Sequence, residues 1–293
     1  DDVLTFNRVA DRRPSVFYIL LRYEEYNTKQ RDQHDRFEAK NSVLYKNKWL
    51  NKVMCDRWAE DFITFLEENL LHKFPKQKIE TRIIPTFDID NTFAFQWKEG
   101  IRKMLGSLKD RLNKDFLRIE ARKAFESGEK KDPYDTFDII KSLKNQGFDV
   151  RVFWLLGEYS KFDKNISPND TRHQILIREM DNYAEIGLHP SYKSNMSLHL
   201  LKNELELLQK ILGHDVRSSR QHFLKLTLPS TYRGLISLGF TDDYSMGFAD
   251  EIGFRAGTSR SFRFFDLMQN TTSDLWIHPF AYMDGTLNQY MKL

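Results

Sequence analysis

Apolar residues in the first 80 positions recur at helical spacing. The segment Phe17–Tyr26 suits a helix with one apolar face. Residues 56–72 carry bulky apolar side chains with the same period, namely Trp58, Phe62, Phe65, Leu66 and Leu70. A polar stretch rich in Gln, Asp and Arg separates the two segments. We therefore predict that residues 1–80 form a mostly helical N-terminal appendage.

From residue 82 onward, short apolar runs alternate with amphipathic segments. Strands are expected at about 82–87, 150–156, 185–189, 215–222 and 240–245. Helices are expected between them, at about 132–147, 170–184, 197–212 and 229–238. The run 150–156 is apolar throughout, as in a strand buried on both faces. Alternating β and α units at this spacing predict an α/β fold with a parallel sheet.

Local signals mark the ends of these helices. Asp132-Pro133 is expected to supply the N-cap and first turn of one helix, and Gly147, Gly213 and Gly239 follow helix ends. Right-handed crossovers then give either an open doubly wound sheet or a closed barrel. No glycine-rich phosphate loop follows any predicted strand, which lowers the nucleotide-binding options. We favour a barrel formed by residues 81–293.

Composition and charge add little to this expectation. The 45 Lys and Arg residues nearly balance 42 Asp and Glu residues, so the totals indicate neither a nucleic-acid nor a membrane partner. No apolar run of about 18 residues is present, and no membrane-spanning segment is expected. The single cysteine, Cys55, excludes an intrachain disulfide and slightly favours a cytoplasmic over a periplasmic location. The chain opens with Asp1-Asp2 and no secretory signal pattern follows, so we expect a trimmed or processed piece.

Polar residues collect where the predicted strands end. Asp88 and Asp90 follow the first strand, and His189 ends the strand at 185–189. The next two strands lead to Arg220 with His222, and to Asp243. In a parallel barrel the carboxyl ends of the strands share one face, where active sites are built. The sequence therefore predicts one site that contains these side chains.

An aspartate and two histidines suggest metal chemistry. Asp90, His189 and His222 would offer one oxygen and two nitrogen ligands, a set that suits Zn²⁺, Co²⁺, Ni²⁺ or Fe²⁺. Such an ion polarises an acyl carbonyl and lowers the pKa of water. Taken singly, each residue has an ordinary alternative. The aspartates can be solvated loop residues, each histidine can be hydrogen-bonded structurally, and Arg220 can form a surface ion pair.

At these residues the chain resembles the polysaccharide deacetylase (NodB-like, carbohydrate esterase) superfamily. Residues 85–90, Pro-Thr-Phe-Asp-Ile-Asp, resemble its Thr-Phe-Asp-Asp motif, and residues 186–191 resemble its strand-end His motif. Residues 220–222, 243–247 and 253–258 resemble later segments. The likeness is greatest to uncharacterised Bacteroidetes-type deacetylase-like proteins, which share a Phe-Tyr-x-Leu-x-Arg-Tyr-Glu-Glu-Tyr segment like residues 17–26. The resemblance spans nearly the whole chain and implies a distorted (β/α)7 barrel.

The resemblance also implies roles for individual residues. Asp88 would be the general base and Asp90 a metal ligand, although Ile89 splits the pair and the roles can be exchanged. His189 matches the first motif histidine, whereas the second falls at Lys193, which cannot replace an imidazole unless it is deprotonated. We expect His222 to supply the missing ligand and Arg220 to orient the base.

The last motif of the family supplies a general acid, for which the sequence offers one candidate. That candidate is His278, in the segment Leu-Trp-Ile-His-Pro at 275–279. The chain ends soon afterwards, at Leu293, so a final strand that carries the true acid is the alternative. In that case His278 is a structural or rim residue.

These observations predict a divalent-metal hydrolase that removes N- or O-linked acetyl groups from a polysaccharide or cell-wall glycan. The Tyr192 hydroxyl or a backbone N–H would stabilise the oxyanion, and Asp243 and Arg255 would line the carbohydrate pocket. Two alternatives remain. The chain can be a catalytically decayed carbohydrate-binding protein, as Lys193 suggests, or a metal-independent glycoside hydrolase that uses Asp88 or Asp90 with Asp243.

Overall fold

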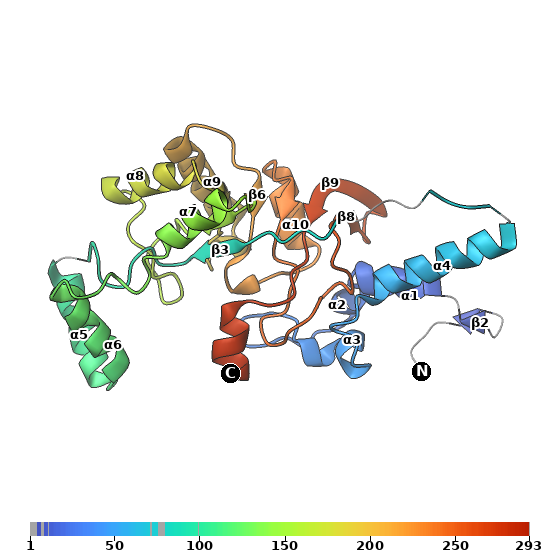
Figure 1. Ribbon diagram of the computed structural model, residues 1–293, viewed down its shortest axis with the longest axis horizontal. Helices are drawn as coiled ribbons and strands as arrows, with labels where there is room; N and C mark the ends of the chain where they lie inside the picture. Colours follow the sequence, from blue (N-terminus) through green and yellow to red (C-terminus); the bar gives the residue numbers. More distant parts are fainter. Residues whose placement is uncertain are drawn as a thin grey trace. The chain divides into compact units, whose positions relative to one another are not determined.

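Two compact units make up the chain. The computed structural model describes residues 5–6, 9–10, 12–70, 72–75, 80–98 and 100–292, and Figure 1 shows their elements. The first unit combines residues 1–82 with 217–293, and the second contains residues 83–216. The division therefore differs from the predicted boundary at residue 80, because the N-terminal segment packs with the C-terminal one. The expectations about the chain ends concern Asp1, Asp2 and Leu293. These residues lie outside the described part of the chain.

The first unit contains the N-terminal helices and a short sheet. Its elements are β1 (Thr5–Phe6), β2 (Val9–Ala10), α1 (Arg12–Leu20), α2 (Tyr23–Asn27), η1 (Ala39–Asn41), α3 (Val43–Lys46), α4 (Met54–Leu70), β6 (Ser218–Ser219), η3 (His222–Leu224), α10 (Ser230–Ser237), β7 (Asp242–Asp243), β8 (Phe262–Asp266), β9 (Thr271–Ile277) and η4 (Thr286–Met291). Strand β7 pairs in parallel with β6 and with β9, and β8 pairs antiparallel with β9. Strands β1 and β2 form a separate antiparallel pair.

The core of the first unit joins residues that are distant in sequence. Ile19, Leu44, Trp58 and Phe248 are buried in one apolar cluster, so helices from the N-terminal segment pack against the loop after β7. The backbone N–H of Cys55 also donates to the carbonyl of Gly257, at 2.9 Å. Burial of these side chains removes a large apolar area from water, which is the main force that holds the two segments together.

Residues 17–26 form two helices rather than the single predicted one. Helix α1 ends at Leu20 and α2 begins at Tyr23, because Arg22 adopts a left-handed conformation with φ of 57°. The buried Arg22 guanidinium donates to Glu24 and Glu25, at 2.7 Å in both cases. Pairing of this buried charge accounts for a backbone conformation that is costly for a residue other than glycine.

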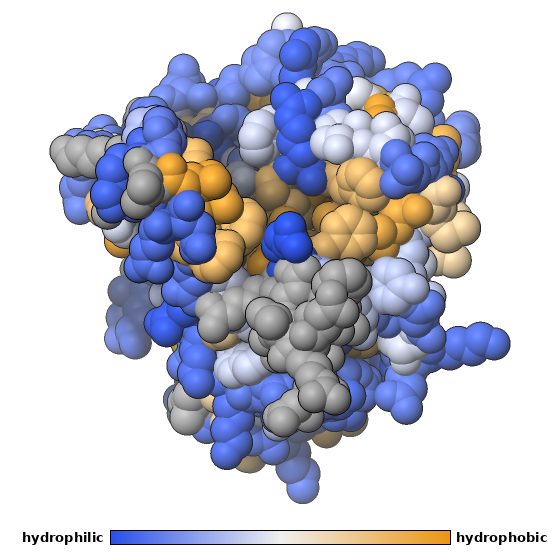
Figure 2. Space-filling view, turned by 90° about the vertical axis from the view of Figure 1, so that its right-hand side faces the viewer, coloured by the Kyte–Doolittle hydropathy of each residue, from blue (hydrophilic) through white to orange (hydrophobic). Residues whose placement is uncertain are grey.

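Helix α4 matches the predicted helix at 56–72, but most of its apolar stripe is exposed. Trp58 is buried, whereas Phe62, Phe65 and Leu70 are 38, 56 and 60% exposed. Figure 2 shows apolar surface on the side of the molecule where α4 lies in Figure 1. The helical period was therefore predicted correctly, and of the stripe residues Trp58 near the start of the helix is buried.

The second unit is an α/β arrangement around three parallel strands. Its elements are β3 (Thr86–Ile89), α5 (Gly100–Leu112), α6 (Phe116–Glu126), α7 (Phe137–Asn145), β4 (Arg151–Trp154), α8 (Thr171–Met180), β5 (Glu185–Leu188), η2 (Ser194–Met196) and α9 (Leu198–Leu212). Strand β4 pairs in parallel with β3 on one side and with β5 on the other. Three residues of β4, Val152, Phe153 and Trp154, have no exposed surface, which confirms the predicted buried strand.

One predicted helix start in the second unit is wrong. Helix α7 begins at Phe137, after Thr136, so Asp132 is not its N-cap. The buried Asp132 carboxylate instead accepts hydrogen bonds from the backbone N–H groups of Ala94, Phe95 and Gln96, at 2.7–2.9 Å. The same preference of aspartate for backbone N–H groups is satisfied by a distant loop rather than by the adjacent helix.

The parallel pairing in both units confirms the predicted α/β class with a parallel sheet. Closure into a barrel remains a prediction. Among the described residues, no helix combines the length and the apolar character that a membrane crossing requires.

Candidate metal centre

Strands β3 and β5 bring Asp90 and His189 together in the second unit. Both strands flank β4, and Ile89 and Leu188 are the register partners of Trp154. Asp90 and His189 are the next residues along their strands, so both leave the same edge of the sheet. Oδ1 of Asp90 lies 3.0 Å from Nε2 of His189. The imidazole is 3% exposed and the carboxylate 56% exposed, so the pair has one buried and one accessible member.

Strand β4, between β3 and β5, is held in place by His173. The sequence analysis did not single out this histidine. Nε2 of the buried His173 accepts a hydrogen bond from Trp154 Nε1 at 2.8 Å and lies 2.9 Å from the Thr92 hydroxyl oxygen. Its Nδ1 lies 3.3 Å from the Ser167 carbonyl and donates to it. Burial lowers the pKa of His173, which keeps the ring neutral and able to accept this bond. A histidine within a predicted helix carried no sequence signal for this role.

The loop after His189 is held by buried acids. The Ser191 N–H donates to Glu204 Oε2 and the Tyr192 N–H donates to Asp163 Oδ1, at 2.9 Å in both cases. Burial raises the pKa of Glu204. Gly157, after β4, leaves space for this loop, because a Cβ at that position would lie 2.3 Å from the Ser191 Cβ. The loop that carries His189 is therefore positioned by three neighbouring segments.

Tyr192 and Lys193 lie on this loop. The half-buried Tyr192 ring stacks on Phe162, with centroids 4.2 Å apart and planes inclined by 29°. The side chain of Lys193, at the position where the second motif histidine is expected, is exposed. Tyr192 thus lies three residues after His189 in the sequence. Lys193 places a cation on the same loop, where the family motif would place an imidazole.

Asp88 lies within β3 rather than after it, which corrects the predicted strand end. Its register partner is Phe153, and its side chain is exposed. Alternation along the strand places Asp88 and Asp90 on one face and the buried Ile89 on the other. Two carboxylates therefore occupy the same face of the second unit, as the spacing predicted.

In the first unit, β6 leads into Arg220 and His222, which are both buried. The Arg220 Nε donates to the Tyr244 carbonyl at 2.9 Å, and the Gln221 N–H donates to the Ser245 hydroxyl at 2.9 Å. These bonds attach the segment after β6 to the segment after β7. Parallel pairing of β6 with β7 explains this, because both strands end at the same edge.

Asp243 has a structural environment that the sequence did not reveal. Its fully buried carboxylate accepts hydrogen bonds from the hydroxyls of Ser219 and Ser245, at 3.0 and 2.9 Å. The Ser245 N–H donates to it as well, at 2.9 Å. Burial raises the pKa of Asp243. A carboxylate with this many internal donors is suited to holding the first unit together rather than to contacting a sugar.

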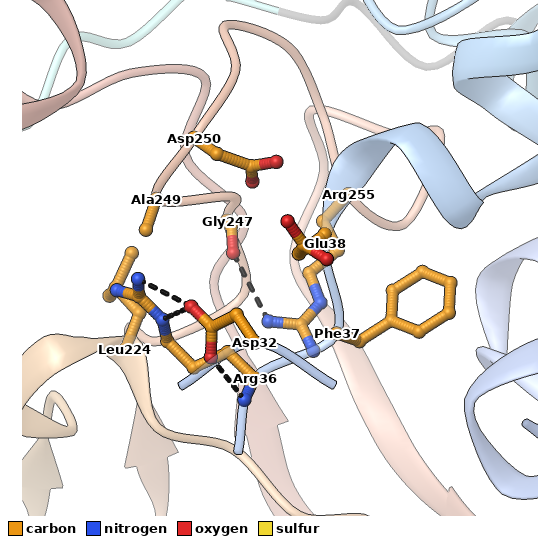
Figure 3. A pocket seen from close by; sticks show the side chains of 9 residues that line it. All are labelled: Asp32, Arg36, Phe37, Glu38, Leu224, Gly247, Ala249, Asp250 and Arg255. Carbon is orange, nitrogen blue, oxygen red and sulfur yellow. Dashed lines mark hydrogen bonds and ion pairs between the residues drawn. The ribbon is translucent and has the colours of Figure 1, made fainter. Parts of the chain in front are cut away.

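Arg255 is likewise committed to an internal ion pair. Its guanidinium donates to both carboxylate oxygens of Glu25, at 2.9 and 2.5 Å, and to the Gly247 carbonyl at 3.2 Å. Arg255 also lines a small pocket, and Figure 3 shows its bond to Gly247 beside the paired side chains of Asp32 and Arg36. Arg255 therefore joins α2 to the loop after β7, and its predicted role in lining a carbohydrate pocket stays a prediction.

His278 follows β9, and both of its ring nitrogens lie close to polar side chains. Its Nε2 lies 2.7 Å from Asp242 Oδ1, and its Nδ1 lies 2.7 Å from the hydroxyl of the exposed Ser261. The ring stacks on Tyr244, with centroids 4.3 Å apart. A carboxylate on one nitrogen and a hydroxyl on the other fix the orientation of the imidazole. The sequence predicted the strand-end histidine but not its two partners.

Asp90 and His189 offer one carboxylate oxygen and one imidazole nitrogen to a metal ion. Asp90 and His189 belong to the second unit, and His222 belongs to the first. A carboxylate beside an imidazole fits a borderline divalent cation, since Zn²⁺ binds both ligand types. His222 as a third ligand stays a prediction. The short distance from Asp90 to His189 supports the fit, because the two atoms that would bind the ion already face each other.

The comparisons with known proteins find only distant similarity. The model of a family of unknown function, DUF7033, matches residues 9–71. No curated protein matches the sequence. A solved structure of a candidate polysaccharide deacetylase from Mycobacterium smegmatis is 14% identical over 71% of this chain, with a TM-score of 0.42. The structure of IcaB from Ammonifex degensii is 13% identical, with a TM-score of 0.33, over 59% of this chain and 87% of IcaB. The chain spans 62% of the length of the Mycobacterium smegmatis protein, and the functional assignment rests on the residues of the site.

Proposed function

We propose that the protein is a divalent-metal-dependent hydrolase of the polysaccharide deacetylase type. It removes N- or O-linked acetyl groups from a polysaccharide or cell-wall glycan. The observation that carries the proposal is the Asp90–His189 pair, in which an accessible carboxylate faces a buried imidazole at 3.0 Å at the ends of two parallel strands. Such pairs at strand ends suit metal binding, because both groups are held before the ion arrives.

The proposed ligands are Asp90, His189 and His222. Zinc is the preferred ion, with cobalt, nickel and iron as alternatives of similar ligand preference. When bound, the ion would act as a Lewis acid toward the acyl oxygen. His222 replaces the imidazole that the second motif lacks at Lys193. The buried position of His222 after β6 supports this role, since a ligand must be held by the protein rather than by solvent.

Asp88 is the proposed general base. Its carboxylate is exposed on the same face of β3 as Asp90, so one aspartate of the pair can bind the cation while the other accepts a proton from the attacking water. Arg220 is the proposed positioning residue for that base. Its Nε donates to the Tyr244 carbonyl, which helps to fix the orientation of the guanidinium.

His278 is the proposed general acid. Asp242 holds its Nε2, and the exposed Ser261 hydroxyl faces its Nδ1. A proton that leaves Nδ1 can pass through the Ser261 hydroxyl, or directly to the leaving group when that hydroxyl rotates away. Asp242 is then a positioning residue, because it fixes the ring that delivers the proton.

The proposed substrate is a carbohydrate, and Tyr192 is its proposed contact. Tyr192 lies three residues after His189, and its stacked ring with Phe162 offers an aromatic surface next to a hydroxyl donor. Asp243 and Arg255 are better explained by their internal hydrogen bonds and ion pair than by sugar binding.

One observation favours a second candidate function. The exposed Lys193, in place of an imidazole, is expected of a catalytically decayed descendant that binds carbohydrate without hydrolysing it. By contrast, the enclosed Asp243 argues against a glycoside hydrolase, because a catalytic carboxylate must reach the glycosidic bond.

An assay on N-acetylated chitooligosaccharides and on an O-acetylated glycan tests the proposal. The wild-type chain should release acetate without shortening the oligosaccharide. Asp88→Asn should abolish release, whereas Asp138→Asn, which alters an exposed aspartate on α7, should not. Binding of sugar without acetate release would support the decayed candidate, and shortened sugars would support a glycoside hydrolase.

A further inference from the structure

Helices α5 and α6 form a hairpin with an unusually apolar surface. Residues at its turn are among the most exposed apolar side chains of the chain, with Leu112, Phe116 and Leu117 at 74, 69 and 82%. Met104, Leu105 and Leu108 continue the same surface along α5 and are all more than half exposed. The spacing of 104, 105, 108 and 112 places these four on one face of the helix. A continuous exposed apolar surface of this kind marks an interaction site.

The hairpin is also the place where positive charge collects. Residues 100–126 contain eight Lys and Arg against four Asp and Glu, a net charge of +4, whereas the whole chain has +3. The total charge of the chain therefore does not reveal that the α5–α6 hairpin is basic. Lys109, Arg111 and Lys114 are exposed beside the apolar turn. The surface combines leucine and phenylalanine with flanking cations, which is typical of elements that lie in a membrane interface.

Internal pairs hold the hairpin together and leave the turn cations available. Asp110 is buried and pairs with Arg122 at 2.5 Å and with Arg118 at 3.1 Å, so two cations of α6 share one acidic partner within the hairpin. Gly106 permits the close approach of α6, because a Cβ there would lie 3.3 Å from Arg122. These contacts hold α5 and α6 together. The apolar turn is therefore part of a packed helical hairpin.

We infer that the α5–α6 hairpin docks on an anionic lipid bilayer. Leu112, Phe116 and Leu117 enter the interfacial region, and Lys109, Arg111 and Lys114 contact the anionic headgroups. Charge complementarity selects this occupant. A second copy of the hairpin would bring the same net charge of +4 and be repelled, and a nucleic acid would leave the leucine and phenylalanine side chains in water. This inference is independent of the proposed hydrolase activity.

Co-sedimentation with vesicles tests the inference. The full chain should pellet with vesicles of phosphatidylcholine and phosphatidylglycerol at a molar ratio of about 3:1, and pellet far less with phosphatidylcholine alone. The triple change Leu112→Ser, Phe116→Ser and Leu117→Ser should lower the partition coefficient at least about tenfold. The change Lys109→Gln, Arg111→Gln and Lys114→Gln should remove the preference for anionic vesicles. High salt should weaken binding of the wild-type chain.

A matched control and a site-specific readout accompany this test. Met196→Ser with Met268→Ser changes two residues that are 72% exposed in other parts of the chain, and binding should be unaffected. A polarity-sensitive dye at Leu117→Cys should shift to the blue on anionic vesicles, while Cys55 is buried and should resist labelling. Equal binding of the triple serine variant, or no preference for anionic lipid, would overturn the inference. A concentration-dependent dimer that the serine variant loses would also overturn it, in favour of a second copy.

Discussion

Oδ1 of Asp90 lies 3.0 Å from Nε2 of His189, across the strand that separates β3 from β5. The two side chains leave neighbouring positions at one edge of the sheet, and the imidazole is buried while the carboxylate is accessible. A cation that binds there competes with any proton shared between the two groups. Metal binding by this pair is therefore expected to weaken at low pH, because metal ligands must be deprotonated to bind.

The role of His278 can be separated from metal binding. If His278 is the general acid, His278→Ala should lower kcat by about 10²- to 10⁴-fold, because proton donation to the leaving group is lost. Metal content should not change, since His278 is not among the proposed ligands. Steady-state kinetics and elemental analysis of the same preparation check both parts.

His199→Ala is the matched control for this change. His199 is exposed on α9, where it contacts only Asn203 among the interactions described for it, and its loss should leave kcat unchanged. Full activity of His278→Ala would place the acid elsewhere and leave His278 as a structural residue held by Asp242 and Ser261.

The buried ion pair of Glu25 should govern acid stability. Burial, the largest single effect, raises the pKa of Glu25, but Arg255 and Arg22 together outweigh it and lower the pKa to about 2. Since the folded-state pKa lies below the unfolded value, Glu25 stabilises the fold at pH values above about 4.5. This contribution should be lost as the pH falls from about 4.5 to about 2.

Glu25→Gln should therefore destabilise the chain at neutral pH by about 3–5 kcal/mol, because two buried guanidinium groups lose a charged partner. The difference from the wild-type chain should shrink as the pH falls through the same interval. Urea unfolding at several pH values measures it. A constant difference across that range would contradict the assigned pairing.

Gly157 should be required for the position of the His189 loop. Gly157→Ala places a Cβ 2.3 Å from the Ser191 Cβ and should destabilise the chain by about 1–3 kcal/mol. Metal affinity should fall as well, because displacement of the Ser191 loop moves His189. Gly285→Ala is the control, since its Cβ would meet nothing closer than 3.5 Å. Equal stability of the two variants in urea unfolding would show that the loop has room to adjust.

Features with strong local signals were predicted well from the sequence. Helix α9 runs from Leu198 to Leu212, after the Ser197 N-cap and before the left-handed Gly213, within one residue of the predicted range. The short strands were predicted too long. Strands β6 and β7 have two residues each, because strand length depends on pairing with neighbours rather than on the apolar run alone.

Non-local contacts account for the predictions that failed. Arg22 interrupts the predicted helix at 17–26 because its charge is paired in the core of the first unit. Asp132 caps a loop at 94–96 instead of the next helix. Neither partner lies at a spacing that a sequence pattern reveals. The packing of the N-terminal segment with residues 217–293 has the same origin, since it depends on tertiary contacts such as Glu25 with Arg255.

The candidate site was predicted in part. Strand ends indicated that Asp90 and His189 lie close together, as parallel strands require. The environment of Asp243 was not indicated in this way, because one of its donors, Ser219, comes from β6 and the other, Ser245, from the segment after β7. The same applies to Asp242 and Ser261, which hold His278 from outside its own segment.

Elemental analysis of protein purified without chelator tests the central claim most directly. The account predicts about one divalent ion per chain for the wild type, with Zn²⁺ the leading candidate. It predicts loss of that ion from Asp90→Ala, His189→Ala and His222→Ala, with retention in His199→Ala. A wild-type chain that holds no stoichiometric metal, or variants of Asp90 and His189 that keep it, would contradict the account.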